Sequence, residues 1–170
     1  MILSRFATVA DTTNLALFCR NTFYDTYYLQ NTQADMVLYM QQYLNDDSIK
    51  LELENADNIF IIMLDDEAII GYAKLTDSIM PKALKSLTGL QISRIYAAKN
   101  YIGKGLGKQL MKQSIQLAVE KNKQVIWLGV WEKNRHAIDF YQEFGFEKFG
   151  EEIFVLGKDE QTDWLMQKQL

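Results

Sequence analysis

The sequence has very few of the residues that build disulfides and metal centres. Among its 170 residues there is one cysteine, Cys19, and one histidine, His136. A single cysteine excludes an internal disulfide and favours a cytoplasmic location. No Cys-x-x-Cys pair is present, so the ligands for a zinc site are too few. The sequence therefore predicts a cytoplasmic protein without a bound metal.

Long apolar runs and an excess of positive charge are also missing. No stretch approaches the roughly 18 apolar residues that cross a membrane, and the apolar run near the N-terminus is too short for a signal peptide. Lys and Arg number 18 against 22 Asp and Glu, which gives a formal net charge of −4. This balance argues against a nucleic-acid partner and is compatible with a cationic substrate. We expect neither a membrane nor a nucleic-acid partner.

The pattern of segments predicts one domain, residues 1–170, of the α+β class. Proline occurs once, and repeats, linkers and low-complexity segments are absent. Strands are expected at 2–8, 58–64, 68–75, 89–97 and 124–131, with two more around a polar loop at 157–162. Helices are expected at 12–28, 33–46, 103–123 and 134–145, and the ambiguous segment 48–55 favours a helix. Strands in runs with helices between the later ones indicate α+β or a mixed sheet.

Four polar or glycine residues mark expected helix ends. Asp11, Thr32 and Asn134 are suitable N-caps for the helices that follow them, and Asp35 is placed for a capping-box contact with Thr32. Gly145 is a suitable stop for the last helix.

The segment "YIGKGLGKQL", residues 101–110, places three glycines between a strand and a helix. The first N–H groups of a helix lack partners within it and carry partial positive charge, and glycines let an anion approach them. A phosphate-bearing ligand is the natural occupant, although a glycine-rich turn without a ligand remains an alternative. Ile102 and Gln109 exclude a Walker A loop, and Leu110 stands where a Rossmann fingerprint needs its third glycine.

Two motifs in this order resemble the GNAT superfamily of N-acetyltransferases. The family's Q/R-x-x-G-x-G/A motif reads "IGKGLG" at 102–107, with Ile102 in place of Gln or Arg. About 30 residues on, "WLGVWEKNRHAIDFYQEFGF" at 127–146 is similar to the family's strand, Asn and F-Y-x-x-x-G-F helix. The C-terminal stretch 154–170 looks most like the PaiA-type polyamine acetyltransferases.

The resemblance implies a mixed, mostly antiparallel sheet flanked by helices, with acetyl-CoA as co-substrate. It implies that the glycine loop holds the pyrophosphate and that the preceding strand pairs with the pantetheine arm. The implied cofactor-binding residues are Ile95, Tyr96, Ala97, Ile102, Gly103, Lys104, Gly105, Leu106, Gly107, Lys108, Asn134 and Tyr141. Two alternatives stay open: the lysines are ordinary solvated charges, and Asn134 only caps its helix.

Tyr141 corresponds to the family tyrosine that protonates the departing thiolate of CoA, with packing as the alternative role. An amine must lose a proton before it attacks the thioester. The strand Leu90–Ala97 carries no carboxylate to accept that proton. The base is then a chain of waters or one of three other carboxylates: Glu132, Asp25 or Glu67.

The expected substrate is a small primary amine, with a polyamine as the leading candidate. The segment 23–35 combines the aromatic residues Phe23, Tyr24, Tyr27 and Tyr28 with Asp25 and Asp35, and carboxylates and aromatic faces suit ammonium groups. At least half of these rings are expected to lie in the core rather than at a substrate site. Two other functions remain open, a protein or peptide N-acetyltransferase and a CoA-binding regulatory module without turnover. A homodimer is expected.

Overall fold

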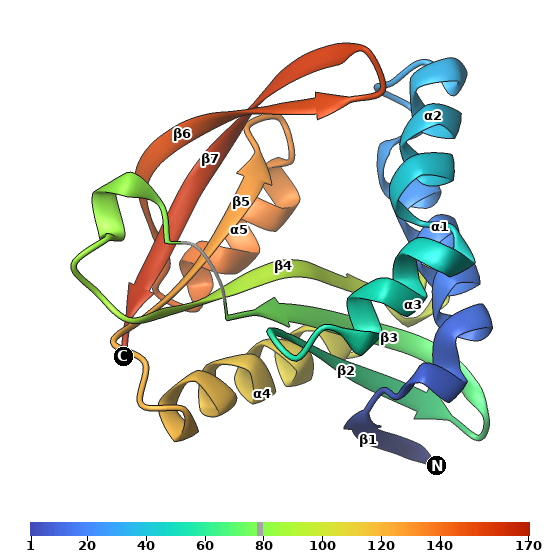
Figure 1. The fold of residues 1–170 in the computed structure, drawn as a ribbon, viewed down its shortest axis with the longest axis horizontal. Helices are drawn as coiled ribbons and strands as arrows, with labels where there is room; N and C mark the ends of the chain where they lie inside the picture. Colours follow the sequence, from blue (N-terminus) through green and yellow to red (C-terminus); the bar gives the residue numbers. More distant parts are fainter. Residues whose placement is uncertain (78–79) are drawn as a thin grey trace.

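The computed structural model describes residues 1–77 and 80–170 and contains a seven-stranded sheet of order β1-β2-β3-β4-β5-β7-β6 (Figure 1). The strands are β1 Ile2–Phe6, β2 Asn58–Asp65, β3 Ala68–Thr76, β4 Gly89–Ala97, β5 Val125–Trp131, β6 Glu147–Leu156 and β7 Asp159–Gln169. The helices are α1 Thr12–Tyr27, α2 Gln33–Tyr43, α3 Asp46–Glu54, α4 Leu106–Glu120 and α5 Arg135–Glu143. Among these strands β4 and β5 form a parallel pair, and the other neighbours are antiparallel. The predicted mixed, mostly antiparallel α+β fold is confirmed.

The sheet opens where β4 and β5 meet. Their pairing covers three residues of each strand, Gly89–Gln91 against Val125–Trp127. Beyond Gln91 the register of β4 against β3 shifts between Lys74 and Leu75, which leaves Ser93 as an extra residue. A bulge of this kind bends a strand. The two halves of the sheet consequently diverge, as the separation of β4 from β5 in Figure 1 shows.

Apolar side chains cover both faces of the sheet. Helix α4 lays its apolar stripe on one face, where Leu106, Leu110, Met111 and Ala118 are buried with Ile138 of α5 in one cluster. The helices α1, α2 and α3 pack on the opposite face over β2 to β4 in a second cluster. Both faces are therefore buried, which explains the unbroken apolar run of β2. The apolar stripe expected in the helix after the glycine loop is confirmed.

Helix α4 starts later and ends earlier than the sequence predicts. It begins at Leu106 rather than Gly103, because Gly103 and Gly105 have φ angles of 80° and 86° that no right-handed helix contains. It ends at Glu120, and Asn122 with a φ of 54° turns the chain toward β5. The loop before α4 is therefore longer than expected.

The C-terminal hairpin has a tighter turn than the predicted loop 157–162. Strand β7 already begins at Asp159, since Gly157 adopts a φ of 63° and closes the turn within two residues. The backbone N–H of Lys158 donates to Asp35 Oδ1 at 2.8 Å, which fixes the hairpin tip against the start of α2. The hairpin thus reaches the N-terminal helices.

The predicted caps differ in what their side chains do. Thr32 Oγ1 accepts the N–H of Asp35 at 3.1 Å, and Gly145 follows α5 with a φ of 83°. Asp11 precedes α1 but makes no cap bond to it. Its carboxylate instead pairs with Arg5 at 2.7 Å and accepts the N–H of Thr8, so it caps the short 3-10 turn Val9–Asp11.

Candidate active site

The loop between β4 and α4 presents a row of backbone donors. The left-handed turns at Gly103 and Gly105 lead into the first turn of α4, where N–H groups lack partners within the helix. Five backbone N–H groups of this loop and of the first turn of α4 have no hydrogen-bond acceptor within residues 1–77 and 80–170. They belong to Gly103, Gly105, Leu106, Gly107 and Lys108. Such a row can bind an anion with several oxygens.

The space around these donors suits a pyrophosphate. A Cβ atom built on Gly103 or Gly105 would meet nothing within 4 Å, and one on Gly107 would meet only the Phe140 ring, at 3.6 Å. The positive end of the α4 dipole adds attraction for negative charge. Ile102 is 60% exposed and contributes no polar side-chain atom. The residues present therefore fit a diphosphate through their backbone.

The two loop lysines have weak local partners. Lys104 Nζ lies 4.7 Å from the centroid of the Tyr101 ring, and the Tyr101 hydroxyl donates to Asp65 at 2.7 Å. Lys108 Nζ lies 3.3 Å from Glu143 Oε2, and both side chains are mostly exposed. Exposed pairs of this kind contribute little to stability. Both ammonium groups can therefore turn toward a bound phosphate.

The three predicted residues of β4 lie where that strand has lost its neighbour. Tyr96 pairs with Tyr72 of β3, while the pairing of β4 with β5 stops at Gln91. Ile95 and Ala97 pack toward α4, and Tyr96 packs toward α1. The free edge of β4 can therefore pair with an extended chain such as a pantetheine arm.

Tyr141 lies on α5 and is almost fully buried, at 8% exposure. Its ring packs against Phe140 and Phe146 with centroid distances of 5.6 and 6.0 Å. The described residues give its hydroxyl no hydrogen-bond partner. Burial raises the pKa of Tyr141 well above its ordinary value of 10, and the nearby Tyr27 adds to the rise. The phenol is protonated at neutral pH, as a phenol with the ordinary pKa would also be, and it can act as an acid.

Asn134 occupies the N-cap of α5. Its Oδ1 accepts the N–H of Ala137 at 3.2 Å, as the sequence predicts. The side-chain NH2 group lies on the side of Tyr27 and lowers the pKa of that hydroxyl, against the larger effect of burial, which raises it. The capping role is confirmed, and it uses the side-chain oxygen of Asn134 rather than its NH2 group.

Aromatic side chains from three elements meet on the α1 side of the gap. The hydroxyl groups of Tyr27 and Tyr96 lie 3.4 Å apart, and the rings of Tyr27 and Trp131 meet edge to face at 6.1 Å. Phe23 is buried, whereas Tyr24 and Tyr28 are exposed and stack on each other at 5.3 Å. Two of the four aromatic residues, Phe23 and Tyr27, therefore pack inside the protein, and Tyr27 lies at the sheet opening.

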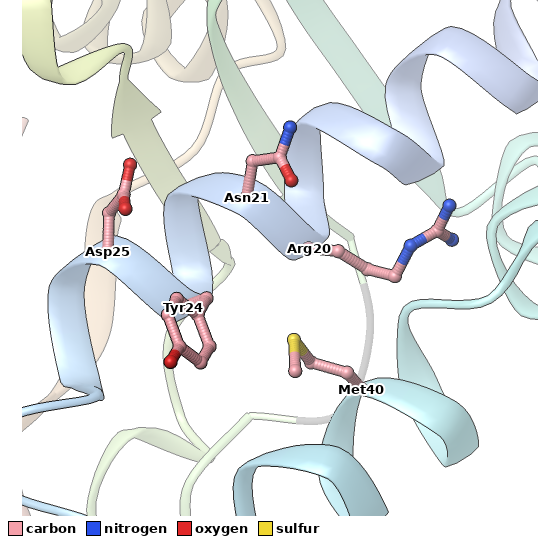
Figure 2. A pocket seen from close by; sticks show the side chains of 5 residues that line it. All are labelled: Arg20, Asn21, Tyr24, Asp25 and Met40. Carbon is pink, nitrogen blue, oxygen red and sulfur yellow. The ribbon is translucent and has the colours of Figure 1, made fainter. Parts of the chain in front are cut away.

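Asp25 and Asp35 do not lie at this opening. Asp25 lines an open pocket of about 440 Å³ between α1 and α2. Figure 2 shows its carboxylate turned away from Met40 on the opposite side of that pocket. Asp35 is engaged by Thr32 and by the hairpin tip.

The other two predicted bases lie at the ends of strands. Glu67 is exposed in the turn between β2 and β3, and Glu132 directly follows β5. The structure brings together a different pair of carboxylates, Glu152 of β6 and Asp163 of β7, beside Gly129 of β5. Sequence reasoning missed this pair because the contact depends on the register of three strands.

Three features of this site occur together: a split sheet with a free strand edge, a row of unpartnered N–H groups at the start of a helix, and a buried protonated tyrosine. They define the class of enzymes that transfer acyl groups from a nucleotide-linked carrier. The acetyltransferase (GNAT) family model matches residues 19–146, and the chain belongs to this family. It is an N-acetyltransferase with acetyl-CoA as its donor.

Two relatives in sequence are similar to this chain over different lengths. An uncharacterised N-acetyltransferase of Lactobacillus delbrueckii subsp. lactis is 38% identical over 151 residues, which cover 89% of this chain and 87% of that protein. A spermine/spermidine N(1)-acetyltransferase of Bacillus subtilis is 44% identical over 61 residues, 35% of this chain and 40% of that protein.

The fold is similar to that of solved acetyltransferases. The PaiA N-acetyltransferase of Thermoplasma acidophilum, solved in complex with coenzyme A, superposes with a TM-score of 0.82. That match has 20% sequence identity and covers 100% of this chain and 99% of the other. It shows the shared fold.

No helix among the described residues is both long and apolar enough to cross a membrane. In the same residues no group of three or more His, Cys, Asp or Glu side chains is arranged to hold a metal ion.

Proposed function

We propose that this enzyme transfers the acetyl group of acetyl-CoA to a primary amine of a small polycation such as spermidine or spermine. The observation that carries the proposal is the row of free N–H groups leading from the split strand β4 into α4. The similarity of one third of the chain to a spermine/spermidine acetyltransferase and the PaiA-like fold support the polyamine as acceptor.

In this proposal the chain's own residues bind the donor along β4. The backbone N–H groups of Gly103, Gly105, Leu106, Gly107 and Lys108 hold the pyrophosphate, with the Lys104 and Lys108 side chains as added charge. The free edge of Ile95–Ala97 orients the pantetheine arm, and the amide of Asn134 contributes a further donor. Bound in this way, the thioester lies at the split between β4 and β5, where Tyr141 is buried.

Tyr141 supplies the proton that the departing sulfur needs. A carbon–nitrogen bond forms between the amine and the acetyl carbonyl carbon, and the carbon–sulfur bond breaks. The thiolate takes the phenolic proton, and the tyrosinate recovers one from the nitrogen of the new amide. Because burial keeps Tyr141 protonated, the acid is ready before the sulfur departs.

The first test is a thiol-release screen with acetyl-CoA against polyamines, aminoglycosides, amino acids and peptides. We expect spermidine and spermine to give the highest kcat/KM. A preference for peptides would favour a protein N-acetyltransferase, and thermal protection by acetyl-CoA without thiol release would indicate a binding module.

A second test addresses the donor site. Gly107→Glu adds bulk and negative charge beside the N–H row, so calorimetry should detect no acetyl-CoA binding. The matched control is Gly107→Ala, whose added methyl group meets only the Phe140 ring at an ordinary contact distance. Unchanged affinity in a folded Gly107→Glu protein would reject the proposed site.

A further inference from the structure

Two carboxylates face each other across the C-terminal hairpin. Glu152 of β6 and Asp163 of β7 are directly paired in the antiparallel register. A Cβ atom built on Gly129 of β5 would lie 3.3 Å from Glu152 Oε1 and 3.5 Å from Asp163 Oδ2. Both carboxylates therefore extend over the same point of β5, which has room for them because residue 129 has no side chain.

This arrangement is unfavourable in the protein alone. Like charges directly opposite each other in a sheet destabilise it. In the part of the chain that the structure describes, neither carboxylate has a Lys, Arg or N-terminal partner within 4 Å. Burial and the charge of Glu152 together raise the pKa of Asp163 to about 6. A cationic ligand between the carboxylates would remove this cost.

Another largely buried carboxylate, that of Glu52, differs from this pair because it has cationic partners. Glu52 of α3 is also largely buried, but it accepts two hydrogen bonds of 2.8 Å from Arg94 and lies 2.9 Å from Lys74 Nζ. Its partners hold its pKa below the ordinary value despite burial. The fold therefore supplies cations to a structural carboxylate, whereas residues 1–77 and 80–170 supply none to the pair at Gly129.

The pair lies at the opening of the sheet. Gly129 is two residues beyond Trp127, the last residue of β5 that pairs with β4. Its neighbours Leu128 and Val130 face the α4 and α5 core, so Gly129 faces the opposite side. The acetyl donor and the two carboxylates are thus expected to meet at the split between β4 and β5, the donor along β4 and the carboxylates on the β5 side.

Tyr27 connects the carboxylates with Tyr141. Asp163 is paired with Trp131 in the sheet, and the Trp131 ring meets the Tyr27 ring. The negative charge of Asp163 acts on the pKa of Tyr27, and Tyr27 in turn acts on that of Tyr141. Tyr141 is buried and its hydroxyl lacks a partner among the described residues. The acid Tyr141 and the carboxylate of Asp163 are therefore both close to Tyr27 of α1.

We propose that Asp163 is the general base of the transfer and that Glu152 and Asp163 together bind the ammonium group of the acceptor. This inference rests on the proposed function and extends it to named acceptor-binding residues. The ammonium first gives one proton to the Asp163 carboxylate, and its lone pair then forms the bond to the acetyl carbon. The proton on Asp163 passes to solvent as the product leaves, and the second nitrogen proton replaces the one that Tyr141 gave to sulfur.

A second ammonium group of the same substrate can remain near Glu152 after the first is neutralised. The titratable groups that face Asp163 are the Glu152 carboxylate from β6 and the neutral Tyr27 phenol from α1, whose pKa burial raises, and the β5 residues beneath it, Gly129 and Trp131, carry no charge. Lys133 lies over the Trp131 ring, 5.6 Å from its centroid. A diamine therefore fits this surface better than a monoamine.

The test compares Asp163→Asn, Glu152→Gln and the control Glu160→Gln, each with acetyl-CoA and spermidine. Glu160 is exposed on the same strand, three residues away, so its side chain faces the other side of the sheet. We expect Asp163→Asn to lower kcat/KM by about 10²–10⁴-fold with little change in the Kd for acetyl-CoA. Glu152→Gln should raise the KM for spermidine by roughly tenfold. Glu160→Gln should match the parent.

The pH profile of kcat/KM identifies the base. The parent should lose activity on the acid side with a midpoint near pH 6, the value to which the pKa of Asp163 is raised. Glu152→Gln should move this midpoint to lower pH, because the negative charge of Glu152 raises the pKa of Asp163 in the parent and its removal lowers that pKa. This readout does not depend on whether Asp163→Asn folds, and an unmoved midpoint overturns the assignment.

The outcomes separate the two proposals. If the parent acetylates spermidine and Asp163→Asn does so within threefold of the same rate, the base assignment is wrong while the function stands. If no amine turns over, calorimetry of spermidine with the CoA-bound protein still tests the binding role. Equal affinity in the parent, Glu152→Gln and Asp163→Asn, or no binding at all, overturns it.

Discussion

Replacing Asp163 by asparagine should stabilise the protein in the absence of ligands while it destroys catalysis. Asparagine has almost the same shape and cannot ionise. It therefore removes a charge that is buried beside Glu152 and has no cation partner in the described residues. A site selected for catalysis retains such an unfavourable charge, whereas a site selected for stability does not.

The magnitude follows from the pKa of Asp163. The difference between about 6 in the folded protein and the ordinary 3.8 corresponds to about 3 kcal/mol at neutral pH. The side chain is partly exposed, so solvent screening reduces the expected gain to about 1–2 kcal/mol. For a chain of this size the melting temperature should rise by about 2–8 °C.

The gain in stability from Asp163→Asn should depend on pH. Because the folded protein raises the pKa of Asp163, it binds that proton more tightly than the unfolded chain does. The destabilisation is therefore absent below about pH 4, grows as the pH rises from 3.8 toward 6 and is complete above that. The gap in stability between Asp163→Asn and the parent should follow the same course.

The assay is thermal and urea unfolding of the parent, Asp163→Asn and Glu160→Gln at pH 4 and pH 7.5, without ligands. Asp163→Asn should be more stable than the parent at pH 7.5 and equal to it at pH 4, with Glu160→Gln unchanged at both. Spermidine should narrow the gap at pH 7.5, because it stabilises the parent more. A variant less stable than the parent at pH 7.5 would refute the reasoning about an uncompensated charge.

Two other predictions concern Tyr141 and the assembly. Tyr141→Phe should lower the single-turnover rate of acetyl transfer by about 10²–10⁴-fold with the Kd for acetyl-CoA nearly unchanged, since the ring still packs against Phe146; a single-turnover rate equal to the parent's would leave Tyr141 a packing role only. Light scattering at micromolar protein should give the mass of a homodimer, and a monomer mass rejects that expectation.

Local sequence patterns were sufficient for most of the elements and for the donor loop. Thr32 and Asn134 cap their helices because a cap needs only a side chain and an N–H group three residues on. The glycines of 103–107 carry their conformation in their own backbone. The predicted start of α4 in this loop was nevertheless wrong by three residues, because the hydrophobic pattern does not indicate the left-handed φ angles at Gly103 and Gly105.

The sequence by itself thus determined the order of the elements and the glycine loop, both of which depend on neighbours in the chain, and its resemblance to the GNAT family supplied Tyr141 as the candidate acid. Only the tertiary structure decided which carboxylates share the sheet opening. Asp25 and Glu67 lie elsewhere, while Glu152 and Asp163 reach Gly129 through the pairing of β6 with β7 and of β7 with β5. A shift of one residue in either pairing would turn these side chains to the opposite face. That register is set by the packing of both sheet faces, which no short stretch of sequence contains.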